Sequence, residues 1–180
     1  MKVIKPLFLD ELTEEYARNQ DDVKKLRTLL IRLGKIKFFD PACGSGNFLI
    51  IAYKAIRELE IEIWERIKTL QGGQSEFPFS NITLQQFYGI EIDEYACDTA
   101  TLSLWLAEHQ MNNKFYERLG TRPDALPLRP SGHIVCGNAC RLDWNTVCPH
   151  TADEEVYVMG NPQYKGFKYQ SEQQKEDKDI

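Results

Sequence analysis

The sequence has little excess positive charge and no long hydrophobic run, and each shortage excludes a class of protein. Its 180 residues include 22 Lys and Arg against 27 Asp and Glu, giving a net charge of -5. This balance argues against a segment that grips a phosphate backbone by itself. No apolar stretch approaches the roughly 20 residues that cross a bilayer, and the N-terminus lacks a secretion-signal pattern. We therefore expect a cytoplasmic protein with no membrane partner.

The chain has five cysteines, and these are scattered along its length. An odd, scattered set is typical of a reducing compartment rather than of a disulfide framework. Five potential metal ligands do cluster near the C-terminal end: His133, Cys136, Cys140, Cys148 and His150. Their spacing matches none of the common zinc patterns, and Cys136 falls in a strand that we expect to be buried. The sequence therefore predicts no metal site.

Apolar periodicity predicts helices alternating with strands. The expected elements are a helical region at 10–33, a strand at 36–40, a helix at 48–70, a strand at 87–92, a helix at 94–111, and strands at 133–136 and 155–159. Gly34 is expected to end the helical region, Asp93 to cap the helix at 94–111, and 112–130 to be mostly connection. This order predicts an α/β fold with a Rossmann-like, doubly wound, mostly parallel sheet.

Four strands make a thin sheet with an exposed edge. We expect an N-terminal helical segment at 1–34, a partial catalytic domain at 35–168 and a polar tail at 169–180. Since a doubly wound enzyme normally continues beyond four strands, we expect the front portion of a larger domain. Alternatively, the chain completes its sheet with a partner, as a homo-oligomer paired at the exposed edge.

A glycine turn follows the first strand and opens the next helix, with the sequence Asp40-Pro-Ala-Cys-Gly-Ser-Gly-Asn-Phe48. Gly44 and Gly46 allow a close approach of backbone to ligand at a helix N-terminus. Leu49 stands where a dinucleotide fingerprint has its third glycine, and no Lys-Ser or Lys-Thr follows as in a P-loop. The turn therefore favours another nucleotide cofactor, and a purely structural turn is the alternative.

Polar side chains end the next two strands. Glu91 is placed to accept hydrogen bonds from both ribose hydroxyls of a nucleotide, although it could simply cap the following helix. Ile92 could cover one face of an adenine ring. Asn138 follows the third strand, where it could read an adenine edge or act as a turn residue.

The fourth strand leads into Gly160-Asn-Pro-Gln-Tyr164, a loop at the carboxyl end of a predicted parallel strand. Open α/β sheets bind ligands at such loops. An asparagine amide can hydrogen-bond to a planar heterocycle, and a tyrosine ring can stack on it. The loop therefore predicts a heterocycle-binding site.

Taken together, the turn at 40–48 and the loop at 161–164 resemble the two motifs of the N6-adenine-specific DNA methyltransferases, in the order which that family has. Phe87-Tyr-Gly-Ile-Glu-Ile-Asp93, Leu104-Trp-Leu106 and His109-Gln-Met-Asn112 are similar to signatures of the methylase domains of large bifunctional restriction-modification enzymes. The resemblance covers most of the chain, from about 3 to 174. It implies transfer of a methyl group from S-adenosylmethionine to adenine N6 in DNA.

The resemblance also implies roles for individual residues. In the family, the asparagine amide and the following carbonyl accept hydrogen bonds from the target amino group, which gives these roles to Asn161 and Pro162, and Tyr164 stacks on the flipped base. The residues implied to hold S-adenosylmethionine are Asp40, Pro41, Ala42, Gly44, Gly46, Phe48, Glu91, Ile92 and Asn138.

The chain departs from the family pattern at two places. Gln163 stands where the family usually has a second proline, and the family's upstream cofactor motif would end near Lys2–Pro6. We therefore expect a fragment whose target-recognition region and DNA grip belong to a longer parent enzyme. The alternatives are methylation of RNA adenine or of a protein glutamine amide, and a non-catalytic remnant that dimerises.

Overall fold

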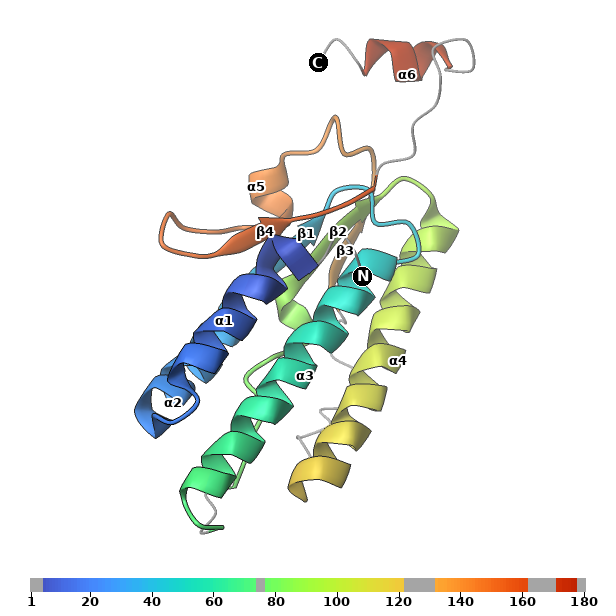
Figure 1. Cartoon of the computed structure of the whole chain (residues 1–180). Helices are drawn as coiled ribbons and strands as arrows, with labels where there is room; N and C mark the ends of the chain where they lie inside the picture. Colours follow the sequence, from blue (N-terminus) through green and yellow to red (C-terminus); the bar gives the residue numbers. More distant parts are fainter. Residues whose placement is uncertain (1–4, 74–76, 122–131, 162–170, 178–180) are drawn as a thin grey trace.

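Four short parallel strands form the sheet at the centre of the computed structural model, which describes residues 5–73, 77–121, 132–161 and 171–177 (Figure 1). The strands are β1 (Lys37–Asp40), β2 (Phe87–Glu91), β3 (His133–Cys136) and β4 (Val156–Val158). Their order is β3-β2-β1-β4, and every pairing is parallel. The chain runs outward from β1 through β2 to β3, then returns to the other side of β1. This reversal makes β1 and β4 the topological switch point of the sheet.

Helices cover both faces of the sheet. The larger ones, α1 to α4, share one face, and the short α5 lies on the other (Figure 1). Their bounds are α1 (Asp10–Asn19), α2 (Val23–Leu33), α3 (Asn47–Leu70), α4 (Glu94–Leu119), α5 (Trp144–Val147) and α6 (Glu172–Glu176), with a π-helix at Lys5–Leu9 and a 3-10 helix at Leu84–Gln86. The structure confirms the predicted α/β class.

Alternating side chains of β1 explain the two layers. Phe38 faces the main core, where its ring stacks on Phe87 with centroids 4.9 Å apart. Its neighbour Phe39 faces the other way and meets the edge of Trp144 on α5. Such alternation is what buries a parallel strand on both faces.

The helical region predicted at 10–33 is two helices, separated by a turn at 20–22. Asp22 caps α2, because its carboxylate accepts hydrogen bonds from the backbone of Lys24 and Lys25. Gly34 ends α2 as predicted, but its φ of -71° is not the left-handed conformation of a glycine stop. A Cβ atom there would lie 2.8 Å from Cβ of Asn81, so close packing explains this glycine.

The helix predicted at 94–111 continues to Leu119, so the expected connection at 112–119 was wrong. Phe115 and Leu119 extend the buried stripe of Met111 at four-residue spacing, and this packing maintains the helix past two asparagines. Gly120, with φ 78°, then ends it in a left-handed cap. Asp93 caps α4 as predicted, accepting a hydrogen bond from the backbone of Ala96 at 2.8 Å.

The four strands lie where the sequence predicts them, with ends that differ by a residue or two, but the prediction that β3 is buried was wrong. Cys136 is exposed, and no residue of β3 is fully buried. The physical reason is position: among the described strands, β3 is at the edge of the sheet and has a neighbour on one side only. Among the described residues, β4 also has one unpaired edge. Dimerisation at an edge stays a prediction.

The N-terminal helices belong to the main core. Leu12 of α1 and Leu26 of α2 are fully buried, in the same cluster as Phe38 of β1 and Leu49 of α3. The division into segments at 34 and 168 stays a prediction. Within the described ranges, no helix is both long enough and apolar enough to span a membrane.

Candidate functional site

The two sequence motifs meet at the switch point between β1 and β4. The backbone N–H of Met159 donates to the carbonyl of Phe39 at 2.8 Å, which continues the ladder between these strands. Gly160 then lies against Asp40, because a Cβ atom at Gly160 would be 2.7 Å from Asp40 Oδ1. Asn161 follows directly and is exposed. The fold therefore brings the predicted catalytic asparagine next to the predicted cofactor turn.

Asp40 is a buried carboxylate with one unsatisfied oxygen. Its side chain is at the end of β1 and 1% exposed. Oδ1 accepts a hydrogen bond from the backbone of Ala42 at 3.0 Å, whereas no donor among the described residues reaches Oδ2. Burial is the main cause that raises the pKa of Asp40 to about 6; the Ala42 hydrogen bond opposes the rise, and the nearby charge of Glu91 adds to it. Such a group is suited to a positively charged ligand.

The two glycines of the turn serve different purposes. Gly44 (φ 54°) and Gly46 (φ 81°) both have the left-handed conformation that favours glycine. A Cβ atom at Gly46 would lie 3.2 Å from Cβ of Ala100, so this glycine lets α4 pack against the turn. A Cβ atom at Gly44 would meet nothing within 4 Å, which leaves open space beside the turn. A ligand could approach the backbone there.

Glu91 has a structural role that differs from both the predicted ribose contact and the alternative of a helix cap, which Asp93 supplies. Its Oε2 accepts from the backbone of Gly44 at 2.8 Å, and Oε1 accepts from Ile92 at 2.8 Å and Asp93 at 3.0 Å. Glu91 therefore ties the glycine turn to the end of β2. A carboxylate offers about four lone-pair positions, so about one remains for a ligand. Its contact with ribose stays a prediction.

The predicted adenine contacts lie at the ends of β2 and β3. Ile92 is 68% exposed, which leaves an apolar surface for a ring. Asn138 is more constrained, because Oδ1 accepts from the backbone of Cys140 at 3.0 Å and Nδ2 donates to Asp177 at 2.7 Å. Asp177 also accepts from Arg141 at 2.8 Å. Asp177 could not be identified as a partner of Asn138 from the sequence, since nothing in a charge-mixed tail distinguishes one aspartate from its neighbours.

The remaining predicted residues have mixed placements. Pro41 is half-buried, with its Cδ 3.7 Å from the Cβ position of Gly160. Phe48, also half-buried, packs against the main core and therefore has a structural role. Pro162, Gln163 and Tyr164 lie outside the described residues. Their roles stay predictions.

The cysteines and histidines that cluster in the sequence are separated by their structural roles. His133 stacks on Tyr88 with ring centroids 4.7 Å apart, and Cys148 is buried beside Phe39 and Ile90. Within the part of the chain that the structure describes, no three His, Cys, Asp or Glu side chains gather as a metal site.

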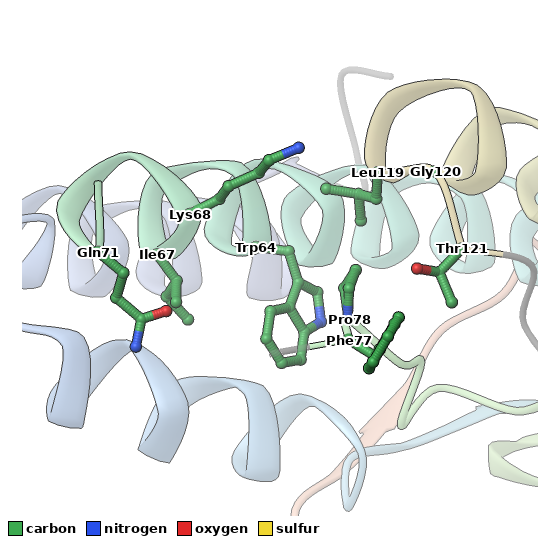
Figure 2. Close-up of a pocket in the computed structure, with 9 residues that line it drawn as sticks. All are labelled: Trp64, Ile67, Lys68, Gln71, Phe77, Pro78, Leu119, Gly120 and Thr121. Atoms are coloured by element: carbon green, nitrogen blue, oxygen red, sulfur yellow. The ribbon is translucent and has the colours of Figure 1, made fainter. Parts of the chain in front are cut away.

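A hollow lies near the C-terminal ends of α3 and α4, at the ends that are away from the two motifs. It has a volume of about 180 Å³, and Figure 2 shows Trp64, Phe77 and Leu119 among the residues that line it. Lys68 is the only charged side chain among its described lining residues. Trp64 follows Gly46 by about five helical turns, or about 27 Å along α3. This mostly apolar hollow is remote from both motifs.

Comparisons with known proteins give consistent relatives. Residues 15–180 match the family model described as the DNA-methyltransferase domain of MmeI. The chain is 54% identical over 179 residues to DNA methyltransferase A of Bacillus subtilis, an alignment that covers 98% of this chain and 20% of that protein. It is 34% identical over 131 residues to a putative type II restriction enzyme and methyltransferase of Methanocaldococcus jannaschii, covering 73% of this chain and 11% of that one.

A solved structure agrees with the fold. The type IIL restriction-modification enzyme MmeI, in complex with DNA, matches with a TM-score of 0.89 and 40% sequence identity, over 98% of this chain and 23% of that one. The chain therefore spans about a fifth or less of the length of the curated relatives named here. The match confirms the Rossmann-like methyltransferase fold.

Proposed function

The chain belongs to the family of MmeI-type DNA-methyltransferase domains, and we propose that the switch point between β1 and β4 transfers a methyl group from S-adenosylmethionine to N6 of adenine in DNA. The observation that carries this proposal is the buried carboxylate of Asp40, which has one oxygen without a donor among the described residues and lies against Gly160, the residue before Asn161. It joins a site for a cation to a site for a planar amino group.

The donor site fits S-adenosylmethionine by its charge and shape. When bound, this cofactor supplies a methyl group on a positively charged sulfur. Oδ2 of Asp40, which no donor among the described residues reaches, suits a cationic ligand, and the open space at Gly44 allows close approach to the backbone. Exposed Ile92 offers a surface for the adenine ring; Glu91 precedes it at the end of β2, and Asn138 follows the neighbouring strand β3.

On the acceptor side, the chemistry needs orientation more than acid–base catalysis. An adenine amino nitrogen is a poor nucleophile because its lone pair is delocalised into the ring. In the proposed mechanism, the amide oxygen of Asn161 and the carbonyl of Pro162 accept hydrogen bonds from the two N–H groups and favour a pyramidal nitrogen. This nitrogen gains the methyl group and releases one proton to solvent. Tyr164 stacks on the base, which offsets part of the few kcal/mol that flipping costs.

The DNA grip comes from elsewhere in this proposal. A net charge of -5 gives the chain no basic footprint for phosphates. Since the relatives are several times longer than this chain, we propose that other regions of a parent enzyme bind the duplex and select its sequence.

The proposal is tested in the natural polypeptide that contains these residues, by calorimetric titration with S-adenosylmethionine and by transfer of labelled methyl to duplex DNA. We expect N6-methyladenine in the digested product. Asn161→Ala should abolish transfer while cofactor affinity changes little, because Asn161 contacts the acceptor base. Asn113→Ala, an exposed asparagine near the far end of α4, is the matched control and should retain activity.

Three results would contradict the proposal. DNA methylation that persists in Asn161→Ala would remove the role of this amide. Absence of any cofactor binding would favour the non-catalytic alternative, and transfer to RNA or protein but not DNA would favour the other substrates.

A further inference from the structure

Asp177, immediately after α6, contacts the residue expected to read adenine. Its side chain is 12% exposed, and Oδ2 accepts from Asn138 Nδ2 at 2.7 Å. Its other oxygen, Oδ1, accepts from Arg141 Nε at 2.8 Å. In Figure 1, α6 lies beyond the carboxyl-end edge of the sheet, on the side where both motifs end. A residue distant in the sequence therefore completes the surroundings of Asn138.

These contacts fix the orientation of the Asn138 amide. A carboxylate can only accept hydrogen bonds, so the end of Asn138 that faces Asp177 must be the NH₂ group. A backbone N–H can only donate, so the end that faces Cys140 must be the oxygen. Hydrogen bonds from Asn138 and Arg141 hold the pKa of Asp177 below its ordinary range, which keeps this group ionised and acceptor-only at neutral pH. An inverted amide would oppose both partners.

We propose that Asp177 is a positioning residue that sets the purine specificity of the cofactor site by fixing the amide of Asn138. This inference rests on the proposed function, because it assumes that Asn138 reads the purine. With its orientation fixed, Asn138 Oδ1 keeps one lone pair for an amino group. A purine with an oxygen at position 6 would instead bring two acceptors together, which is repulsive.

The test compares two ligands that differ at purine position 6 and, as a consequence, in whether the adjacent N1 carries a hydrogen. S-adenosylhomocysteine carries the amino group, and S-inosylhomocysteine, its deaminated analogue, carries an oxygen. Their dissociation constants are measured by calorimetry at pH 7.5 in the natural polypeptide. Asp177→Asn replaces an obligate acceptor with an amide that can also donate, so only the backbone N–H of Cys140 still favours the observed orientation and the inverted Asn138 amide gains population. We expect the preference for the amino ligand to fall about three- to tenfold, the scale of one hydrogen bond.

Two further variants separate positioning from docking of α6. Asp177→Glu keeps an acceptor-only group and should retain most of the preference. Glu176→Gln removes a neighbouring charge whose side chain is 74% exposed and 3.7 Å from Arg141, and it should behave as wild type.

The outcomes distinguish the inference from the function beneath it. If Asp177→Asn keeps the wild-type preference, or weakens both ligands equally, Asp177 does not set specificity and the inference is overturned. If the wild-type protein binds neither ligand, the proposed cofactor site fails, and this inference fails with it. A collapsed preference in Asp177→Asn alone supports the inference.

Discussion

Replacing Asp40 with asparagine should stabilise the protein at alkaline pH relative to acidic pH. The pKa of Asp40 rises from an ordinary 3.8 to about 6 because the carboxyl is buried. The folded state therefore binds the proton more tightly than the unfolded state, and the resulting stability is lost as pH rises through about 6. An asparagine amide carries no charge at any pH, so the Asp40→Asn protein escapes this loss.

The magnitude follows from the same pKa values. A rise from 3.8 to about 6 corresponds to about 3 kcal/mol in total. About 2 kcal/mol of this falls between pH 4.5 and pH 8, since the unfolded-state carboxyl is mostly ionised at pH 4.5. The new amide would also bury an unpaired N–H at a cost of about 1–3 kcal/mol. That cost is the same at both pH values and cancels when they are compared.

Urea unfolding, followed by tryptophan fluorescence, measures this difference. The free energy of unfolding of Asp40→Asn minus that of wild type should be about 2 kcal/mol higher at pH 8 than at pH 4.5. Asp22→Asn is the control, because it removes the carboxylate that caps α2, outside the candidate site. Asparagine caps a helix about as well as aspartate does. The difference for Asp22→Asn should stay within about 0.5 kcal/mol at both pH values. A pH-independent difference for Asp40→Asn would refute the reasoning that burial raises the pKa of this carboxyl.

Three further substitutions test other parts of the structure. Gly160→Ala places a methyl group 2.7 Å from Asp40 Oδ1, so we expect at least about a tenfold loss of methyl transfer, and unchanged kinetics would contradict the contact. Glu60→Gln removes the counter-charge of the buried Arg57 guanidinium, whose Nε lies 3.0 Å from Glu60 Oε2. Urea unfolding should show that the free energy of unfolding falls by about 3–5 kcal/mol, and a fall below about 1 kcal/mol would argue that water reaches the pair. Phe115→Ala, in the unpredicted end of α4, should cost about 3–5 kcal/mol, whereas a frayed helix end would lose almost nothing.

Much of the local structure could be predicted from short-range patterns. Short apolar runs predicted the four strands of the described sheet, and Asp93 caps α4 as predicted. The predictions failed where distant residues decide. Packing of Phe115 carries α4 beyond its two asparagines, and packing against Asn81, rather than a left-handed turn, explains Gly34.

The site shows the same division. Its motifs could be found in the sequence, but Glu91 illustrates what could not. An acidic residue inside an apolar run indicates a ligand, yet the structure gives Glu91 three backbone donors from Gly44, Ile92 and Asp93. One of these donors lies 47 residues away. A contact between residues so far apart in the sequence cannot be predicted from a local pattern.

By itself, the sequence determined the class of fold and the residues of both motifs, because apolar periodicity and turn chemistry act over a few residues. Only the tertiary structure decided that β4 returns beside β1, which places Gly160, the residue before Asn161, against Asp40. It also decided that Asp40 is buried with one oxygen that no described residue satisfies, and that Asp177 holds Asn138. Strand order and loss of solvent depend on the whole chain, and these properties make the switch point a candidate site for methyl transfer.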